Sequence, residues 1–240
     1  MMTHLKIDYV EFCSPAFHAS RDFFANAFGW SFQDYGPTYA AMTNAGIDGE
    51  TVVELWGGTA DQKSKAPWTR DTLSIVFSCT KGATALCAHV LASQGKLDLD
   101  APVRELWPEF AQHGKGHVTT RMMLDHSSAV PAVRAKVKDD GPYDWDYMTA
   151  CLAGEEPFWQ PGTRNGYHGF TFGWTVGEMV RRVSGKSLGT FFRDEIAGPL
   201  GIDFWIGLPE EMEPRVAPIV AHVYKAADAV TPFMRDLATN

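Results

Sequence analysis

The sequence has few of the features that mark disulfide-bonded, membrane-spanning or nucleic-acid-binding proteins. Cysteine is scarce: Cys13, Cys79, Cys87 and Cys151 form no CxxC pair and no regular spacing, so free thiols and a cytoplasmic location are expected. No apolar run reaches the length that a bilayer requires, and the N-terminus lacks a signal-like core, so no membrane association is predicted. Lys and Arg, 21 in all, are outnumbered by 29 Asp and Glu, and the net charge of −8 argues against a nucleic-acid partner.

What is present divides into two parts of different character. In residues 1–49 the pattern predicts a strand at 5–12, then a helix, then two further strands. Beyond these residues a strand and an extended segment lead into a chain predicted to be mostly helical, at about 79–94, 101–107, 119–125, 143–152, 168–183 and 187–197. The expected organisation is therefore two units, 1–49 and 50–240, of α+β (mixed α/β) class.

The pattern Ser-x-x-Lys, which can form the core of a nucleophilic site, occurs twice, at Ser78 to Lys81 and at Ser93 to Lys96. Average residue usage gives about one such match by chance in a chain of this size, so only context separates the two. Ser93 lies where the helix at 79–94 is predicted to end, and the glycine two residues later suits the position after a last turn. A structural role is predicted for Ser93.

Ser78 lies at the opposite end of the same predicted helix. Unpaired backbone N–H groups and the positive end of the helix dipole favour negative charge developing on a serine oxygen there. Lys81 lies one helical turn further along, on the same face of the predicted helix as Ser78. An amine beside that positive end loses part of its preference for the protonated form and becomes a usable proton acceptor. The alternative is that Ser78 only caps the helix and Lys81 is solvated.

Tyr167 is the candidate for the further proton-transfer group that a nucleophilic serine needs. It follows a Pro-Gly-x-x-x-Gly loop and precedes a predicted helix, so its phenol is expected at a loop tip. Cationic neighbours lower the pKa of a tyrosine toward the range in which phenolate acts as a base. The alternative is a ring that packs beneath the loop.

Two long stretches carry a resemblance to a known family. Residues 76–116 (beginning VFSCTKGATALCAHV) and 159–211 (beginning WQPGTRNGYHGFTFGW) resemble the nucleophile and tyrosine regions of the serine hydrolases that include class C β-lactamases and β-lactamase-like carboxylesterases. The resemblance covers about residues 50–220. It implies a partial β-lactamase/transpeptidase-like fold with a mostly helical subdomain.

By the same resemblance Ser78 is the acylated nucleophile, Lys81 its activating partner and Tyr167 the general base, with no cofactor and no metal ion. The segment MLDHSSAVP (123–131) also corresponds to the family, and its His126 is interpreted as structural.

Two departures from the family shape the expected activity. Gly169 stands where the lactamase branch usually carries an asparagine that binds the lactam amide, which favours simple esters. The family's third motif, a late strand that supplies the second oxyanion donor, has one candidate, Trp205-Ile206-Gly207, which is interpreted as a chance match. With that motif and the following strands lacking, weak or absent activity is expected, and exposed apolar surface would favour homo-oligomers.

The first fifty residues resemble a different family, the vicinal-oxygen-chelate superfamily of glyoxalases and bleomycin-resistance proteins. The order of elements matches one βαβββ half-module. Tyr9 occupies the position at which a His or carboxylate would bind the metal, and Asp8 and Glu11 are the remaining candidates, so no metal site is predicted. We interpret the chain as a truncated half-module of this superfamily fused to a truncated hydrolase.

The leading hypothesis is a serine hydrolase that cleaves small carboxylic esters through an acyl-enzyme. The alternative is a non-catalytic chimera that acts by binding or association. A third hypothesis is small-molecule binding by the chelate-type module.

Overall fold

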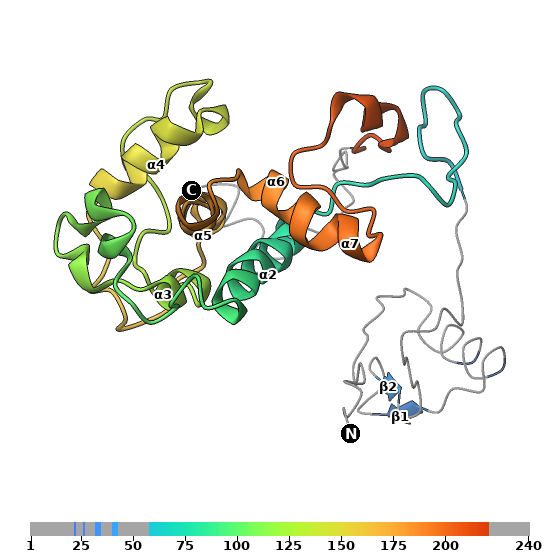
Figure 1. Ribbon diagram of the computed structural model, residues 1–240. Coiled ribbons are helices and arrows are strands. Elements are labelled where there is room, and N and C mark those ends of the chain that lie inside the picture. The colour runs from blue at the N-terminus through green and yellow to red at the C-terminus, as the bar shows by residue number, and fades with distance from the viewer. Residues whose placement is uncertain (1–21, 23–25, 27–31, 35–39, 43–57, 221–240) are drawn as a thin grey trace, which may run out of the picture. The chain divides into compact units, whose positions relative to one another are not determined.

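The computed structural model describes residues 58–220 and, before them, residues 22, 26, 32–34 and 40–42 (Figure 1). The chain divides into two compact units, Met1–Arg70 and Asp71–Asn240. The predicted boundary near residue 50 falls outside the described residues and stays a prediction.

In the first unit, strands β1 (Phe32–Asp34) and β2 (Ala40–Met42) pair antiparallel, with Phe32 opposite Met42. Both lie where the sequence predicts its second and third strands. Of the helix predicted before them, only residues 22 and 26 are described, and both are helical. The other elements of the predicted βαβββ half-module lie outside the described residues, as do Tyr9, Asp8 and Glu11.

The second unit is helical over the residues that the structure describes, as the sequence predicts. Its α-helices are α2 (Thr80–Ser93), α3 (Thr120–Leu124), α4 (Trp145–Gly154), α5 (Thr171–Ser184), α6 (Leu188–Phe192) and α7 (Gly198–Leu200). A π-helical stretch, η6 (Arg193–Ala197), joins the last two. Short 3-10 turns complete the list: η1 (Phe77–Cys79), η2 (Val103–Glu105), η3 (Pro108–Ala111), η4 (Lys115–His117), η5 (Gly141–Tyr143) and η7 (Glu210–Arg215). Strand pairing in residues 71–220 is limited to isolated bridges, such as Leu73 with Val216.

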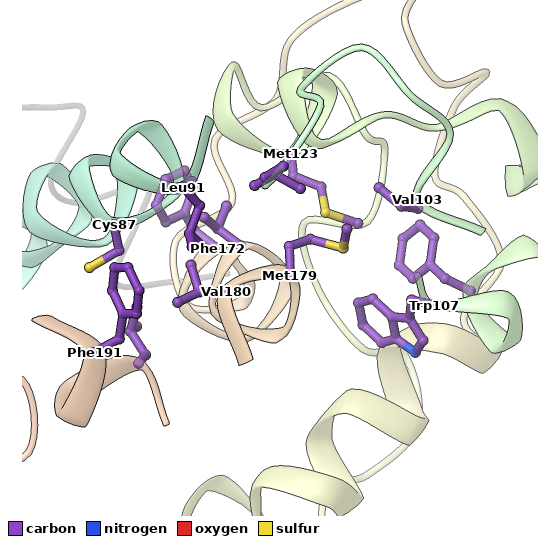
Figure 2. Packing of buried hydrophobic residues seen from close by; sticks show 14 of the residues in the cluster. Cys87, Leu91, Val103, Trp107, Met123, Phe172, Met179, Val180 and Phe191 are labelled. Atoms are coloured by element: carbon purple, nitrogen blue, oxygen red, sulfur yellow. The ribbon is translucent and has the colours of Figure 1, made fainter. Parts of the chain in front are cut away.

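The core of this unit lies around α5, with α2, α4 and α6 packed against it (Figures 1 and 2). Cys87 and Leu91 of α2 meet Phe172 and Val180 of α5, and Phe191 of α6 closes the same cluster (Figure 2). Apolar residues that recur every three or four positions put one stripe of each helix into this core. The N-terminal ends of α2 and α5 are thereby held in one rigid framework.

Glu178 is a fully buried carboxylate on α5 that ties the framework together. It accepts hydrogen bonds from Trp145 Nε1 of α4 at 2.8 Å, from Arg181 Nε at 2.8 Å and from Arg182 Nε at 2.6 Å. Burial acts to raise the pKa of the Glu178 carboxyl, but its three donors together hold that pKa below its usual value. The carboxylate is therefore charged and fully paired in the folded protein.

Ser93 has the structural role that the sequence predicts. It is the last residue of α2, and its Oγ donates to the carbonyl of Val90 at 2.8 Å. Gly95 takes a left-handed conformation with φ of 68°, and Lys96 N–H then reaches the Leu91 carbonyl at 2.9 Å. Such a left-handed residue satisfies carbonyls that the helix end leaves without partners. The second Ser-x-x-Lys pattern therefore marks the C-terminal end of α2.

Candidate active site

The entrance to α2 places Ser78 on an exposed turn. The 3-10 turn η1 runs directly into α2, and its residues are exposed. The N-cap of η1 is Val76 and that of α2 is Cys79, so the interpretation of Ser78 as a mere helix cap is wrong. Phe77, immediately before Ser78, has φ of 43° with its side chain 69% exposed. A bulky residue in that conformation stores backbone strain next to the candidate nucleophile.

Lys81 is half-buried and connects two distant parts of the chain. Its Nζ donates to Ser78 Oγ at 3.1 Å and to the backbone carbonyl of Gly169 at 2.7 Å. The same Nζ lies 4.8 Å from the centroid of the Tyr167 ring. The alternative of a solvated lysine is therefore wrong, because the ammonium is held by two acceptors and faces an aromatic ring.

Tyr167 lies on the loop before α5, with its side chain 62% exposed. The alternative of a ring packed beneath the loop is therefore wrong. Hydrogen bonding to Ser78, then to Lys81, lowers the pKa of the Tyr167 phenol, and the charge of Lys81 adds to the effect. These contacts bring Ser78, Lys81 and Tyr167 together from two segments almost ninety residues apart in sequence.

Two histidines close to Tyr167, His168 on the same loop and His126 from a distant segment, were not assigned to the site from the sequence. His168 is fully buried; Val130 N–H donates to its Nε2 at 3.2 Å, and its Nδ1 lies 2.6 Å from the carbonyl of Gly166. Because Nε2 accepts, the ring proton is on Nδ1 and is donated to Gly166. Burial lowers the pKa of His168, so the ring is neutral.

His126 lies between that loop and α5. Its ring centroid is 5.1 Å from that of Tyr167 and 5.1 Å from that of Phe172. The one sequence signal for this arrangement is the MLDHSSAVP segment, which marks His126 but does not show which residues it contacts.

A cavity of about 520 Å³ opens beside the η1 turn. Its apolar lining residues come from the approach to Ser78 and from the segment after α7: Leu73, Ile75, Val76, Phe77, Phe204, Trp205, Leu208 and Val216. Asp203 and Glu213 add two carboxylates to the wall. Apolar walls next to a candidate nucleophile suit the hydrocarbon part of a small-molecule ligand.

Trp205-Ile206-Gly207 lies in an irregular segment and not in a strand. Trp205 Nε1 donates to Asp203 at 2.8 Å, and the carbonyl of Ile206 lies so close to Gly189 that a side chain there would clash. The segment is packed against α6. Its interpretation as a chance match to the third motif fits this conformation.

A Gly-x-Ser-x-Gly pattern at residues 185–189 has no place in the sequence-based hypothesis, although this pattern marks the nucleophile of another hydrolase class. Its central serine, Ser187, is the N-cap of α6 and accepts from Thr190 N–H at 3.2 Å. Ser187 is exposed, but it starts a helix as an ordinary cap and follows the end of α5 instead of a strand, so it lacks the strand-to-helix turn of that class.

The described part of the chain has features that bear on metal, disulfide and membrane-spanning sites. No group of three or more His, Cys, Asp or Glu side chains there could hold a metal ion. Cys79, Cys87 and Cys151 are free thiols. None of the described helices has both the length and the apolar character to cross a bilayer.

Comparison with known proteins gives a family match over residues 45–238, to the family described as Beta-lactamase. The chain is 40% identical over 195 residues to Esterase/beta-lactamase LipL of Mycobacterium tuberculosis (strain ATCC 25618 / H37Rv), covering 80% of this chain and 45% of that protein. It is 29% identical over 178 residues to Esterase EstB of Burkholderia gladioli, covering 64% of this chain and 43% of that protein. The chain thus spans less than half the length of these curated relatives.

Among solved structures, a family VIII carboxylesterase has a TM-score of 0.68 and 38% identity, covering 89% of this chain and 58% of that one. A penicillin-binding protein homologue from Caulobacter crescentus has a TM-score of 0.67 and 32% identity, covering 95% of this chain and 62% of that one. These likenesses fit the β-lactamase/transpeptidase-like fold that the resemblance implies. The family match begins at residue 45, and these matches give no support to the chelate-type resemblance of the preceding residues.

Proposed function

Because the chain belongs to the Beta-lactamase family, we propose that it is a serine hydrolase that cleaves small carboxylic esters through an acyl-enzyme. The observation that carries the proposal is the pair of hydrogen bonds from Lys81, to Ser78 Oγ and to Gly169, with the Tyr167 ring beside the same ammonium. Names of relatives support the ester class: one is an esterase/beta-lactamase, and one solved structure is a carboxylesterase.

In acylation, the Tyr167 phenolate accepts the proton of Ser78 while Ser78 Oγ attacks the carbonyl carbon of the ester. The carbonyl oxygen becomes an oxyanion at the entrance to α2, where the Ser78 backbone N–H and the positive helix end stabilise it. When the tetrahedral intermediate collapses, the alcohol leaves with the proton held by Tyr167. The products of this half-reaction are an acyl-Ser78 ester and a free alcohol.

Deacylation repeats the sequence with water. Tyr167 takes a proton from water, the resulting hydroxide attacks the acyl carbon, and Ser78 recovers a proton from Tyr167 as it leaves. The net change is ester plus water to carboxylic acid plus alcohol. Lys81 orients Ser78 and stabilises the phenolate by its charge throughout, while the Gly169 carbonyl holds the ammonium in place.

Two features favour esters as the substrate class. Gly169 presents a backbone carbonyl to Lys81 and has no side-chain amide with which to bind a lactam. The apolar cavity beside Phe77 offers room for the hydrocarbon part of an ester. Simple aliphatic or aryl esters without charge are the expected substrates, because the described cavity walls are mainly apolar.

A second mode of action, association with another polypeptide, is favoured by one observation. Ile75 (55% exposed), Phe77 (69%), Ile219 (56%) and Val220 (69%) place apolar side chains in solvent on two segments that are joined by the bridge of Leu73 to Val216. Exposed apolar patches of this kind mark contact surfaces. Because Ile75 and Phe77 also line the cavity beside the η1 turn, a partner seated on this surface would cover part of that cavity and compete with an ester substrate.

We also propose a division of the chain into two domains and a cellular location. Residues 1–49 are proposed as a separate module of chelate type, supported by the resemblance of their sequence. Residues 50–240 are proposed as the hydrolase domain. A cytoplasmic location is proposed from the free thiols of Cys79, Cys87 and Cys151.

The test of the proposed function is hydrolysis of p-nitrophenyl butyrate by the purified full chain, with Ser78→Ala as the reference and a chromogenic cephalosporin as the competing substrate class. Release of p-nitrophenol that Ser78→Ala loses, with cephalosporin turnover at background, supports the proposal. Equal ester hydrolysis by wild type and Ser78→Ala, or no hydrolysis by folded protein, would overturn it.

A further inference from the structure

His126 makes hydrogen bonds to both chain neighbours of Tyr167. The backbone N–H of Gly166 donates to the His126 carbonyl at 3.0 Å. The backbone N–H of His168 donates to His126 Nδ1 at 3.1 Å. A single residue therefore fixes the main chain immediately before and immediately after the candidate base.

The His126 ring also defines where the phenol lies. Its ring contacts the Tyr167 ring at 5.1 Å between centroids on one side and the Phe172 ring at 5.1 Å on another. Phe172 belongs to the first turn of α5 and is buried in the core. The phenol is thus connected to the rigid helical framework through the imidazole.

The backbone of His126 supports a role beyond packing. Its φ is 66°, in the left-handed region that non-glycine residues seldom adopt. Residues held in such conformations gather at functional sites, where the surrounding contacts outweigh the strain. In this case the contacts include the carbonyl that receives Gly166 and the ring nitrogen that receives His168.

We propose that His126 is a positioning residue for Tyr167, and that only its neutral imidazole holds the phenol beside Lys81 and Ser78. The inference rests on the proposed function. In the neutral ring Nδ1 is the acceptor and Nε2 carries the proton. The two hydrogen bonds that flank Tyr167 form a clamp, and a second ring proton would occupy Nδ1, point at the donating N–H of His168 and break that half of the clamp. The other half, from Gly166 N–H to the His126 carbonyl, does not depend on the ring.

The charges around His126 favour the neutral form. Burial lowers the pKa of the His126 imidazole, and the positive charge of Lys81 on α2 lowers it further. Asp125, its chain neighbour, acts in the opposite direction. His168 and Tyr167 are the other titratable groups that face the ring. The hydrogen bond from His168 N–H to the His126 ring is therefore stable at neutral pH and is lost in acid, while the bond to the His126 carbonyl stays.

Three variants separate positioning from packing. His126→Asn keeps an acceptor close to the place of Nδ1, and asparagine tolerates a left-handed backbone better than most residues do. His126→Phe keeps an aromatic ring against Tyr167 and Phe172 but cannot accept the His168 N–H. His126→Ala removes both the hydrogen-bond acceptor and the aromatic ring. Circular dichroism and thermal unfolding establish which variants are folded.

The first readout does not depend on catalysis. Tyrosinate absorbance, taken as the difference from a Tyr167→Phe background, gives the titration of Tyr167 in the full chain. We expect His126→Asn to keep the lowered pKa of Tyr167 and His126→Phe to move that pKa toward the ordinary value of about 10. An unchanged Tyr167 titration in His126→Phe would overturn the inference even if the protein proves to be no esterase.

The second readout is the pH profile of kcat for p-nitrophenyl butyrate. Wild type should lose activity about tenfold per pH unit where Tyr167 alone titrates, and about a hundredfold per unit once His126 also protonates, because two groups must then lose protons. His126→Asn should retain kcat within about fivefold at neutral pH and show only the shallower slope. His126→Phe should lose about tenfold to a hundredfold in kcat with KM little changed.

Equal losses in His126→Asn and His126→Phe, or a steep acid limb that persists in His126→Asn, would overturn the positioning role. If His126→Phe does not fold, the slope of the His126→Asn profile alone decides between these outcomes. An inactive wild type with a lowered Tyr167 pKa would contradict the proposed function and leave the clamp to be judged by the titration.

Discussion

The backbone carbonyl of Gly169 accepts a hydrogen bond from Lys81 Nζ at 2.7 Å. The acceptor that fixes the ammonium is therefore a peptide group, which cannot titrate. Gly169 lies two residues after Tyr167 on the loop before α5, so this bond also limits the distance between the lysine and the phenol. The Lys81 side chain thereby links the candidate nucleophile Ser78 to the loop that carries the candidate base Tyr167, and it supplies the positive charge beside both.

Removing the Lys81 charge should raise the pKa of Tyr167. In Lys81→Gln the phenolate loses a hydrogen-bond donor and a neighbouring positive charge, both of which lower that pKa in the wild type. Tyrosinate absorbance, compared with a Tyr167→Phe background, measures the change. Lys96→Gln, at the far end of α2, is the matched control and should leave the titration as it is. A Tyr167 titration that is the same in Lys81→Gln and wild type would refute the link.

Tyr167→Phe should lower kcat for ester hydrolysis by about a hundredfold to ten-thousandfold with KM little changed, because the phenol acts in proton transfer. Since the base must be deprotonated and its pKa is lowered, wild-type activity should rise with pH below the ordinary tyrosine value of about 10. Steady-state kinetics between pH 6 and 10 (about neutral to the ordinary tyrosine range) measure both effects. Tyr143→Phe, a change at a tyrosine that is 92% exposed, is the control. Full activity in Tyr167→Phe would rule out the assigned base.

Gly166→Ala should reduce activity without touching the reacting groups. A Cβ at Gly166 would overlap the indole of Trp159, whose Nε1 is held by the carbonyl of Arg164 at 3.0 Å. Because that hydrogen bond holds the indole, we expect the tyrosine loop to shift, and a shift of about 1 Å at a catalytic group costs up to about a hundredfold in rate. Gly154→Ala is the matched control, because nothing lies within 4 Å of the added carbon there. Equal kcat in the two variants would contradict the expectation.

Glu178→Gln should lower the free energy of unfolding by about 2–3 kcal/mol, because three donors lose a charged acceptor in the core. The folded-state pKa of Glu178 is lowered, so its contribution is present above the unfolded value of 4.5 and is lost as pH falls through the lower folded value. Urea unfolding at pH 7 and in acid (about pH 3) measures both effects, with the difference between variants expected to shrink in acid.

Asp100→Asn is the control for this prediction. Asp100 pairs with Arg121 at the surface, at 2.6 Å between Oδ1 and Nε, and both side chains are exposed. Exposed pairs of this kind contribute about 0–1 kcal/mol. A loss in Glu178→Gln no larger than that in Asp100→Asn would show that the buried cluster does not hold α4 to α5.

The helices and the structural role of Ser93 could be predicted because their signals are local. Apolar spacing marks α2 and α5, and Gly95 marks the end of α2, which identifies Ser93 as a terminal residue. Ser78 could be placed at the opposite end of the same helix by the same reasoning. Local patterns of this type extend over one or two turns of chain.

The clamp around Tyr167 could not be predicted, because it depends on contacts between segments about forty residues apart. His126 and His168 are joined by a hydrogen bond across 42 positions, and nothing local in either segment shows that pairing. Lys115 is a further case: the loop-like HGKGH sequence suits solvent, yet the side chain is fully buried and donates to the Ala153 carbonyl at 3.1 Å. Long-range packing decides such positions.

Covalent labelling with a fluorophosphonate probe, read by intact mass and peptide mapping, tests the central claim most directly. We expect one adduct per chain, on Ser78, lost in Ser78→Ala and retained in Ser93→Ala. Folded wild-type protein that stays unlabelled, or a Ser78→Ala variant that labels as fast as wild type, would contradict the account.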